Sequence, residues 1–453
     1  MLRLSNDQRS LWESVLPEEV LQLSEELTRV DELLEDERLF KPFRDKFYTR
    51  RGRPTLPVAT YLRMMYLKRR YGLGYESLVK EVKDSFSWRH FCHLSFNDPV
   101  PDASTLIKLT HKYGEDTVKA LNDALVVKLK ESKVVRGRKL RLDTTVIEAN
   151  IHYPTDASLL ADGIKLITRS ARRIKKAGVG GEARVVNRMR TVKKIMSGIS
   201  RVARERISRT GPSSLQAMKE LMDVAREVVV QGRDVLRGAD GEIREISSKV
   251  RREIFLLKRW LDLSEKIMEQ TGAVLKGERH IPDRIVSLFD TGARPIVRGK
   301  ARNPVEFGRK VLLGETDKGI ITTYQVVEGN PADSNLLRPG VKGHRHLFRR
   351  RLKAVTADRG FQSLENERWL EEQKVKRIAL PFRGKKDKER REYEKQPWFC
   401  RLIRFRAGCE GRISHLKRVF GLGRSLMGGT GGAEIWVGQG IFAYNLWQAA
   451  RRM

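Results

Sequence analysis

Three well-separated acidic residues, Asp143, Asp358 and Glu410, have the types and surroundings expected of a phosphoryl-transfer centre. Asp143 lies in an alternating, β-branched run that predicts a strand, Asp358 ends a later predicted strand, and Glu410 lies in a late predicted helix. Carboxylate oxygens are the hard ligands that Mg²⁺ prefers, and three close carboxylates imply a cation because they otherwise repel one another. Two ions about 3.5–4 Å apart would activate the attacking oxygen and stabilise the leaving one.

Glu410 has the most informative sequence context of the three. It follows Arg406 by four residues and precedes Lys417 by seven. At about 100° per residue, these side chains project from one face of a helix. A carboxylate between two cations can hold metal while its neighbours contact phosphate oxygens. The spacing also fits a surface ion pair between Arg406 and Glu410, which is worth only about 0.2–0.5 kcal/mol.

Other potential ligands form weaker patterns. Three further acidic residues compete with Asp143 for the first position: Glu148, Asp156 and Asp162. Asp143 is preferred because it lies inside the predicted strand. The histidines and the cysteine within 90–93 lack a second ligand pair at the spacing of a zinc site, which favours packing in a helical module. His344 and His346 lie in a basic run and are expected to contact phosphate or solvent.

The elements that would position the three carboxylates predict an α/β domain. Strand patterns occur at 139–150, 284–289, 295–298, 305–313, 319–327, 353–358 and 376–381. Helical patterns occur at 333–350, 362–373, 402–420 and 433–452, and a basic loop is expected at 384–396. This order of strands and helices indicates a mixed sheet flanked by helices.

A long, highly charged helical stretch, 160–277, separates the first of these strands from the others. Apolar residues recur in it at intervals of three and four residues, and glycines interrupt it near 178–181, 211 and 238–241. The pattern predicts three or four amphipathic helices, inserted into the α/β domain.

The N-terminal region predicts a group of short helices. Segment 17–38 is acidic, has leucines at helical spacing and is expected to form a helix that packs on, or pairs with, something basic. A basic turn leads to short helices at 57–71, 75–84 and 87–94, and another helix opens at 103. This arrangement suits a helix-turn-helix-like DNA-binding domain, and a small helical dimerisation module is the alternative.

Composition narrows the functional classes. The chain has 453 residues, enough for several domains, and its 91 Lys and Arg against 57 Asp and Glu give a formal charge of +34. Such an excess attracts polyanions, above all nucleic acids. The polar start, the lack of a long apolar run and three scattered cysteines predict a cytoplasmic, nucleoid-associated protein without a membrane partner. No glycine-rich loop typical of ATP-driven enzymes occurs.

The motifs around the three carboxylates resemble those of the DDE transposases of bacterial insertion sequences. DTTVIEAN contains Asp143, ADRGF contains Asp358, and the last helix carries R-x3-E-x6-K. The resemblance implies a ribonuclease-H-like catalytic fold over 139–425. Related members have a tyrosine three residues before the arginine of the last motif, where this chain has Ile403.

The same resemblance implies a domain organisation. The stretch 54–113, with RGRP at its start and PDASTL, resembles the helical DNA-binding domain of such transposases. The expected parts are an acidic helical segment (1–50), a helical DNA-binding domain (51–135), a ribonuclease-H-like catalytic domain (136–159 and 278–430), a helical insertion after its first strand (160–277) and a C-terminal helix (431–453).

The implied activity is metal-dependent DNA cleavage followed by strand transfer. Activated water would free a 3′-hydroxyl at the element's end, and that hydroxyl would attack target DNA. Asp143, Asp358 and Glu410 would be both the catalytic residues and the ligands of Mg²⁺ or Mn²⁺, with two ions expected. The DNA contacts would come from Arg406, Lys417, Arg359, Arg51 and Arg53.

The expected partners are the terminal inverted repeats of the element and the target DNA, bound by a homodimer. Two other functions remain compatible with the sequence. One is a metal-dependent nuclease or resolvase on the same fold, which would cleave DNA without joining it to a target. The other is a catalytically inert DNA-binding regulator.

Overall fold

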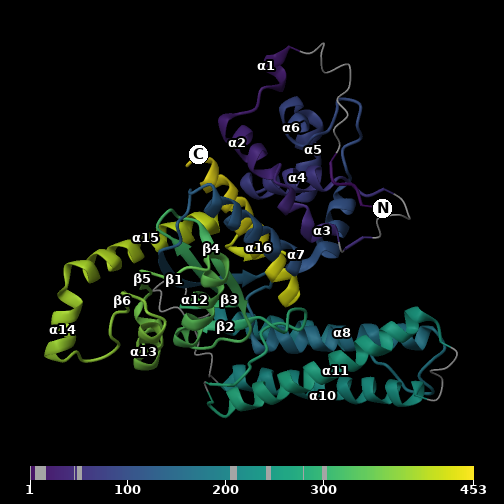
Figure 1. The fold of residues 1–453 in the computed structure, drawn as a ribbon. Coiled ribbons are helices and arrows are strands. Elements are labelled where there is room, and N and C mark those ends of the chain that lie inside the picture. Colours follow the sequence, from purple (N-terminus) through teal and green to yellow (C-terminus); the bar gives the residue numbers. More distant parts are fainter. Residues whose placement is uncertain are drawn as a thin grey trace. The chain divides into compact units, whose positions relative to one another are not determined.

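The protein is described by a computed structural model that covers residues 2–5, 17–44, 46–47, 54–204, 212–240, 246–278, 280–297 and 304–453. The chain separates into two compact units, one formed by residues 1–150 and 308–453 and the other by residues 151–307. Figure 1 gives the elements of both units. Among the described residues, no helix is both long and apolar enough to span a membrane.

The described residues form a seven-stranded mixed sheet around β1 (Lys139–Ala149). The strand order is β2 (Arg294–Val297), β3 (Val305–Thr316), β1, β5 (Ala354–Thr356) and β6 (Arg377–Ala379), while β4 (Ile321–Val327) also pairs with β3, and β7 (Arg424–Ser425) with β1. β1 runs antiparallel to β3 and parallel to β5, and β5 runs parallel to β6. The predicted mixed α/β architecture is therefore confirmed.

Helices cover both faces of this sheet. On the face of Leu140 and Leu142, the apolar core includes α12 (Leu337–Phe348), which follows η3 (Asp333–Leu336), and α13 (Leu364–Glu372), which follows η4 (Arg359–Phe361). Gly340 lets α12 approach closely, since a methyl group there would lie 2.8 Å from Leu142 Cδ2. α15 (Pro397–Val419) packs against β1, β5 and β6, and α16 (Gly429–Ala450) packs against β4.

Apart from α1 (Glu18–Leu21), the N-terminal helices share one apolar core with α16. They are α2 (Glu25–Leu34), η2 (Glu37–Leu39), α3 (Lys41–Arg44), α4 (Val58–Arg70), α5 (Tyr75–Asp84), α6 (Phe86–Phe91) and α7 (Ala103–Glu131). The expectation that the acidic segment pairs with basic groups is confirmed. Glu26 accepts two hydrogen bonds from Arg70 on α4, and Asp31 pairs with Arg63 on the same helix.

The described residues of the second unit contain four helices, in agreement with the three or four expected. They are α8 (Asp156–Lys176), α9 (Met189–Arg204), α10 (Pro212–Ala239) and α11 (Ser248–Leu275). α8, α10 and α11 run alongside one another around a core of their own (Figure 1). The apolar face of each helix supplies that core, as amphipathic periodicity requires.

Three local predictions were wrong. Segment 284–289 is not a strand, because the backbone of Ile285 bonds to the side chain of Gln270 and Ser287 accepts hydrogen bonds from the next turn. The expected loop at 384–396 contains α14 (Lys388–Lys395), whose first turn is capped by Asp387. The acidic segment is two helices, since Ser24 caps the start of α2.

Candidate active site

Asp143 lies in the middle of β1, at a step in the pairing of that strand. β1 pairs with β5 only up to the register Arg141–Thr356, and with β7 only from Glu148 onward. Among the described strands, residues 142–147 of β1 therefore pair on the β3 side alone. The Asp143 side chain is 10% exposed and accepts a hydrogen bond from the amide of Thr144. A buried carboxylate at an unpaired strand edge is available to a ligand from that side.

Asp358 follows the end of β5, the strand that lies beside β1. It comes two residues after Thr356, where the parallel pairing of β5 with β1 ends at Arg141. Asp358 also caps η4, because its Oδ1 accepts from the amide of Gly360 at 2.9 Å. This hydrogen bond fixes the orientation of the Asp358 carboxylate.

Glu410 reaches this region from α15, through a shared arginine. Arg406 Nη2 lies 3.7 Å from Asp143 Oδ2 and 3.5 Å from Glu410 Oε1. The Glu410 side chain is 73% exposed, while that of Arg406 is 22% exposed. Arg406 Nε is buried and has no hydrogen-bond partner within the described part of the chain. An anionic ligand oxygen would satisfy this donor.

The oxygens of Asp143, Asp358 and Glu410 do not form a tight cluster. Within the described ranges, the one set of three acidic, histidine or cysteine side chains with ligand atoms mutually within 4.8 Å lies elsewhere. Arg406 Nη2 lies near both Asp143 and Glu410, and Asp358 follows the end of β5, the strand beside β1. The donors are hard carboxylate oxygens, which fit a divalent cation such as Mg²⁺.

A fourth acidic residue, Asp333, lies beside Asp358 and was not predicted. Its Oδ1 accepts a hydrogen bond from Lys310 Nζ at 2.9 Å, and its Oδ2 from the Thr144 hydroxyl at 3.2 Å. A methyl group placed on Gly360 would lie 3.1 Å from both Asp333 Oδ2 and Asp358 Oδ1. The two carboxylates therefore flank Gly360, and Asp333 links the turn after β5 to β1 and β3.

A buried ion-pair network fixes α15 against the sheet. Glu315 on β3, with a side chain 3% exposed, accepts hydrogen bonds from Arg141 on β1 and, at 2.8 Å, from Arg412 on α15. Arg141 also donates to the carbonyl of Phe405. Burial raises the pKa of Glu315, although both arginines act in the opposite direction. The network holds the helix that carries Arg406 and Glu410.

Cys409, the thiol next to Glu410 in the sequence, is unsuited to act as a nucleophile. Cys409 is buried beside Glu410 in the sequence, and burial raises the pKa of its thiol well above the usual range, with Asp143 and Glu315 adding to the shift. A thiol with a raised pKa carries little thiolate and is a poor nucleophile. The reactive oxygen would have to come from water or from the substrate.

The residues predicted to contact DNA differ in exposure, and two of them are not described by the structure. Lys417 is half-buried on α15, and Arg359 is exposed beside Asp358. Arg51 and Arg53 lie outside the described residues. The expectation that His344 contacts phosphate or solvent was wrong, because it is fully buried between the Thr322 hydroxyl and the carbonyl of Gly137. The basic residues around His344 suggested an exposed position, whereas His344 lies on the buried face of α12.

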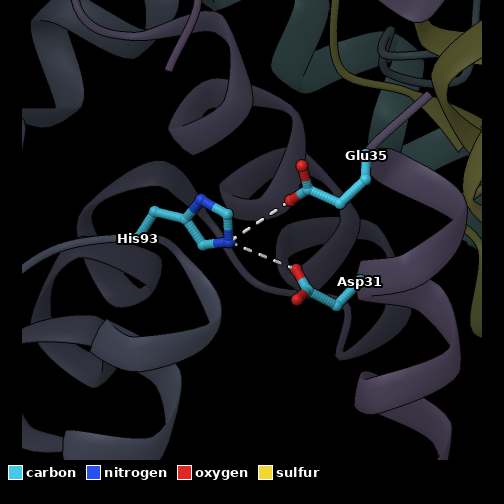
Figure 2. Close-up of side chains that lie close together, drawn as sticks. All are labelled: Asp31, Glu35 and His93. Carbon is cyan, nitrogen blue, oxygen red and sulfur yellow. Dashed lines mark ion pairs between the residues drawn. The ribbon is translucent and has the colours of Figure 1, made fainter. Parts of the chain in front are cut away.

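A second group of potential ligands lies among the N-terminal helices. Figure 2 shows His93 facing Asp31 and Glu35, with Nε2 at 3.4 Å from Asp31 Oδ1 and 3.6 Å from Glu35 Oε1. Arg63, whose side chain is fully buried, pairs with both carboxylates. A metal ion would have to displace this guanidinium. The ion pairs of this group instead connect α2, α4 and the end of α6.

Comparisons with known proteins identify two transposase families in the sequence. Residues 16–112 match the family described as "Transposase domain (DUF772)", and residues 290–446 match the family described as "Transposase DDE domain". The second match includes Asp358 and Glu410, while Asp143 lies outside both.

A protein of Rhizobium meliloti described as "Uncharacterized protein ORF8 in nfe locus" is 27% identical over 132 residues, which is 28% of this chain. The match spans 64% of that relative's length. No solved structure matches the chain. The two family matches together take in more than half of the residues, and the chain belongs to the DDE transposases of insertion sequences.

Proposed function

We propose that this protein binds the ends of an insertion sequence and catalyses their cleavage and their transfer to target DNA. The observation that carries the proposal is Arg406, whose Nη2 lies 3.7 Å from Asp143 and 3.5 Å from Glu410, beside the stretch of β1 that has no β5 partner. The family implies DNA as partner and typically uses a divalent metal. The order β4-β3-β1-β5-β6, in which β3 is antiparallel to both of its neighbours β1 and β4, supports a ribonuclease-H-like fold.

Asp143, Asp358 and Glu410 would hold two ions of Mg²⁺ or Mn²⁺, which supply Lewis-acid activation of the phosphate and of the attacking oxygen when bound. Arg406 would donate its free Nε–H to a phosphate oxygen. Lys417 and Arg359 would contact neighbouring phosphates. These residues orient the scissile phosphodiester and stabilise the charge that develops on it.

The chemistry consists of two phosphoryl transfers without a covalent protein intermediate. In the first, the oxygen of water bonds to phosphorus, the bond to the 3′ oxygen breaks, and that oxygen leaves as a free hydroxyl with a proton. In the second, the same 3′-hydroxyl attacks a phosphate of target DNA and releases a target 3′-hydroxyl. One site can serve both steps because the leaving group of the first is the nucleophile of the second.

A strand-transfer assay tests the proposal. The purified protein is incubated with Mg²⁺ or Mn²⁺, duplex DNA carrying the repeats that flank the gene, and a target plasmid. We expect cleaved and joined products with wild type, and at least about a hundredfold loss of both with Asp358→Asn or Glu410→Gln at unchanged DNA affinity. Glu389→Gln, an exposed carboxylate on α14, is the matched control.

The alternatives give different products in the same assay. A nuclease or resolvase would cleave the repeats without joining them to the target. A DNA-binding regulator would bind the duplex and leave it intact. Wild-type activity that persists in both Asp358→Asn and Glu410→Gln would refute the assignment of the site.

A further inference from the structure

One face of α8, in the second unit, carries an exposed row of basic side chains. Lys165, Arg169, Arg172 and Lys176, here called the α8 stripe, are all exposed. Their offsets of 4, 7 and 11 residues from Lys165 place them within about 60° of one another around the helix. At about 1.5 Å per residue, the stripe is roughly 16 Å long. The opposite face of α8 is buried in the core of the unit.

The α8 stripe is part of a groove rather than an isolated helix surface. The groove has a volume of about 610 Å³, and its lining also includes Thr168, Arg173, Asn187 and Met189. Arg173 forms an ion pair with Glu253 at 2.7 Å, so the cations of the lining that remain without an ion pair among the described residues are those of the α8 stripe.

Basic residues dominate the sequence of this region, although two of its arginines, Arg173 and Arg188, form ion pairs with acids of neighbouring helices. Of the 32 residues from 163 to 194, 11 are Lys or Arg, and Glu182 is the one acidic residue. No member of the α8 stripe forms an ion pair with a described residue. In the same unit, arginines of α10 pair with acids, as in Arg226–Asp223, Arg233–Glu265 and Arg237–Asp234. A surface needed only for solubility interleaves both signs, since like charges repel in the folded state.

We propose that the groove along the α8 stripe binds the phosphodiester backbone of double-stranded DNA. The stripe length corresponds to about five base pairs, and each cation placed on a phosphate releases a counterion. Backbone contacts position a duplex without reading its sequence. The inference rests on the proposed function, because it gives the second unit a contact with the DNA on which the candidate active site acts.

The test compares two triple variants of the full-length protein. Arg169→Ala/Arg172→Ala/Lys176→Ala removes three unpaired cations of the stripe, and Arg226→Ala/Arg233→Ala/Arg237→Ala removes three paired ones from α10. The affinity of each variant for a duplex of about 30 base pairs is measured in EDTA across a range of salt concentrations. Thermal unfolding of each variant shows that the fold is kept.

For the stripe variant we expect the dissociation constant at about 0.15 M salt to rise at least about tenfold, and the slope of log affinity against log salt to fall by about 2–3. The loss should be the same for terminal-repeat and scrambled duplexes, because phosphates carry no sequence information. The α10 variant should change affinity less than about twofold.

Two results would overturn the proposal. One is a stripe variant that binds duplex DNA with the same affinity as the α10 variant. The other appears if the affinity for duplex RNA is measured in parallel and the stripe variant loses affinity for the RNA alone. Because binding is measured without metal, neither result affects the cleavage test of Asp358 and Glu410. Conversely, a wild-type protein that fails to cleave can still show the expected binding loss.

Discussion

The carboxylates of the candidate site differ in their freedom to move. Asp143 is fixed on a central strand with 10% of its side chain exposed, whereas 73% of the Glu410 side chain is exposed. An exposed side chain changes rotamer within nanoseconds and at little cost. If both hold metal as proposed, Asp143 provides the fixed ligand position and Glu410 is the ligand that can adjust. Arg406, close to both, ties the adjustable group to the fixed one.

Asp333 is expected to be a positioning residue of this site. Asp333→Asn keeps the shape but removes the charge that offsets buried Lys310 and holds the turn of Asp358. Residues that orient metal ligands typically contribute about 10- to 100-fold to activity or metal affinity. We expect a loss of that size in cleavage, with a rise in the Mg²⁺ concentration for half-maximal rate and unchanged DNA affinity.

Asp317→Asn is the matched control for this substitution, because Asp317 is exposed in the turn after β3. A metal titration separates the positioning role from a merely structural one. If Asp333→Asn lowers the thermal stability but leaves the metal requirement of the remaining activity unchanged, Asp333 is a structural residue.

The site depends on where two elements end and how one is held. β5 stops at Thr356 while β1 continues, and this difference in length opens the edge beside Asp143. α15 is fixed above that edge by Glu315, which joins β1, β3 and the helix. On the opposite face, α12 is held by His344 between β4 and the segment before β1. The position of each carboxylate is therefore a property of several elements.

The buried His344 predicts a loss of stability in acid. Burial lowers its pKa from 6.5 to about 4, so the folded protein keeps it neutral. Between those values the unfolded chain binds the extra proton, and the free energy of unfolding falls as the pH drops from 6.5 to 4. The loss over this window is on the order of 3 kcal/mol, since one pKa unit corresponds to about 1.4 kcal/mol.

This effect is measured by thermal unfolding of His344→Gln and wild type from pH 7.5 to 4. The variant is expected to be less stable at pH 7.5, because the glutamine does not reproduce both imidazole bonds, but to lose less stability in acid. His111→Gln, at an exposed position of α7, should keep the wild-type pH dependence. Parallel curves for wild type and His344→Gln would contradict the prediction.

Local patterns were enough to predict most elements but not the contacts among them. β1, α4, α5 and α8 follow from the apolar spacing within a few residues of sequence. The break before α2 and the helix α14 were missed because single capping residues, Ser24 and Asp387, decide them. The mixed sheet was predicted from the order of strands and helices. The roles of Asp143, Asp358 and Glu410 and the domain boundaries remain predictions.

The residues that support the site were not predictable, because their partners are distant in the sequence. Glu315 meets Arg141 across 174 positions and Arg412 across 97, and Asp333 meets Thr144 across 189. No periodicity links such positions. In the same way, the basic residues of α4 suggested DNA contact, but Arg63, Lys68 and Arg69 are buried against acids and aromatic rings.

At the scale of the whole molecule, the charge of +34 is unevenly used. Part of it is internal to the fold, in the pairs that join α2 to α4 and α15 to the sheet. The α8 stripe is instead exposed and of one sign. On the proposed function, the net charge would attract DNA over distance, whereas the groove of α8 and the donors near Arg406 would act at contact. Binding and cleavage should therefore be separable by mutation.

Cleavage and joining of two ends further predict that a homodimer acts on DNA. If equal amounts of wild type and Glu410→Gln associate at random, about a quarter of the dimers contain two active sites. Transfer of paired ends, scored by joined products from both ends, should then fall to about a quarter of the wild-type level at constant total protein. Independent monomers would instead give about half. Mixing wild type with Glu389→Gln should cause no loss, because that substitution is expected to leave both protomers active.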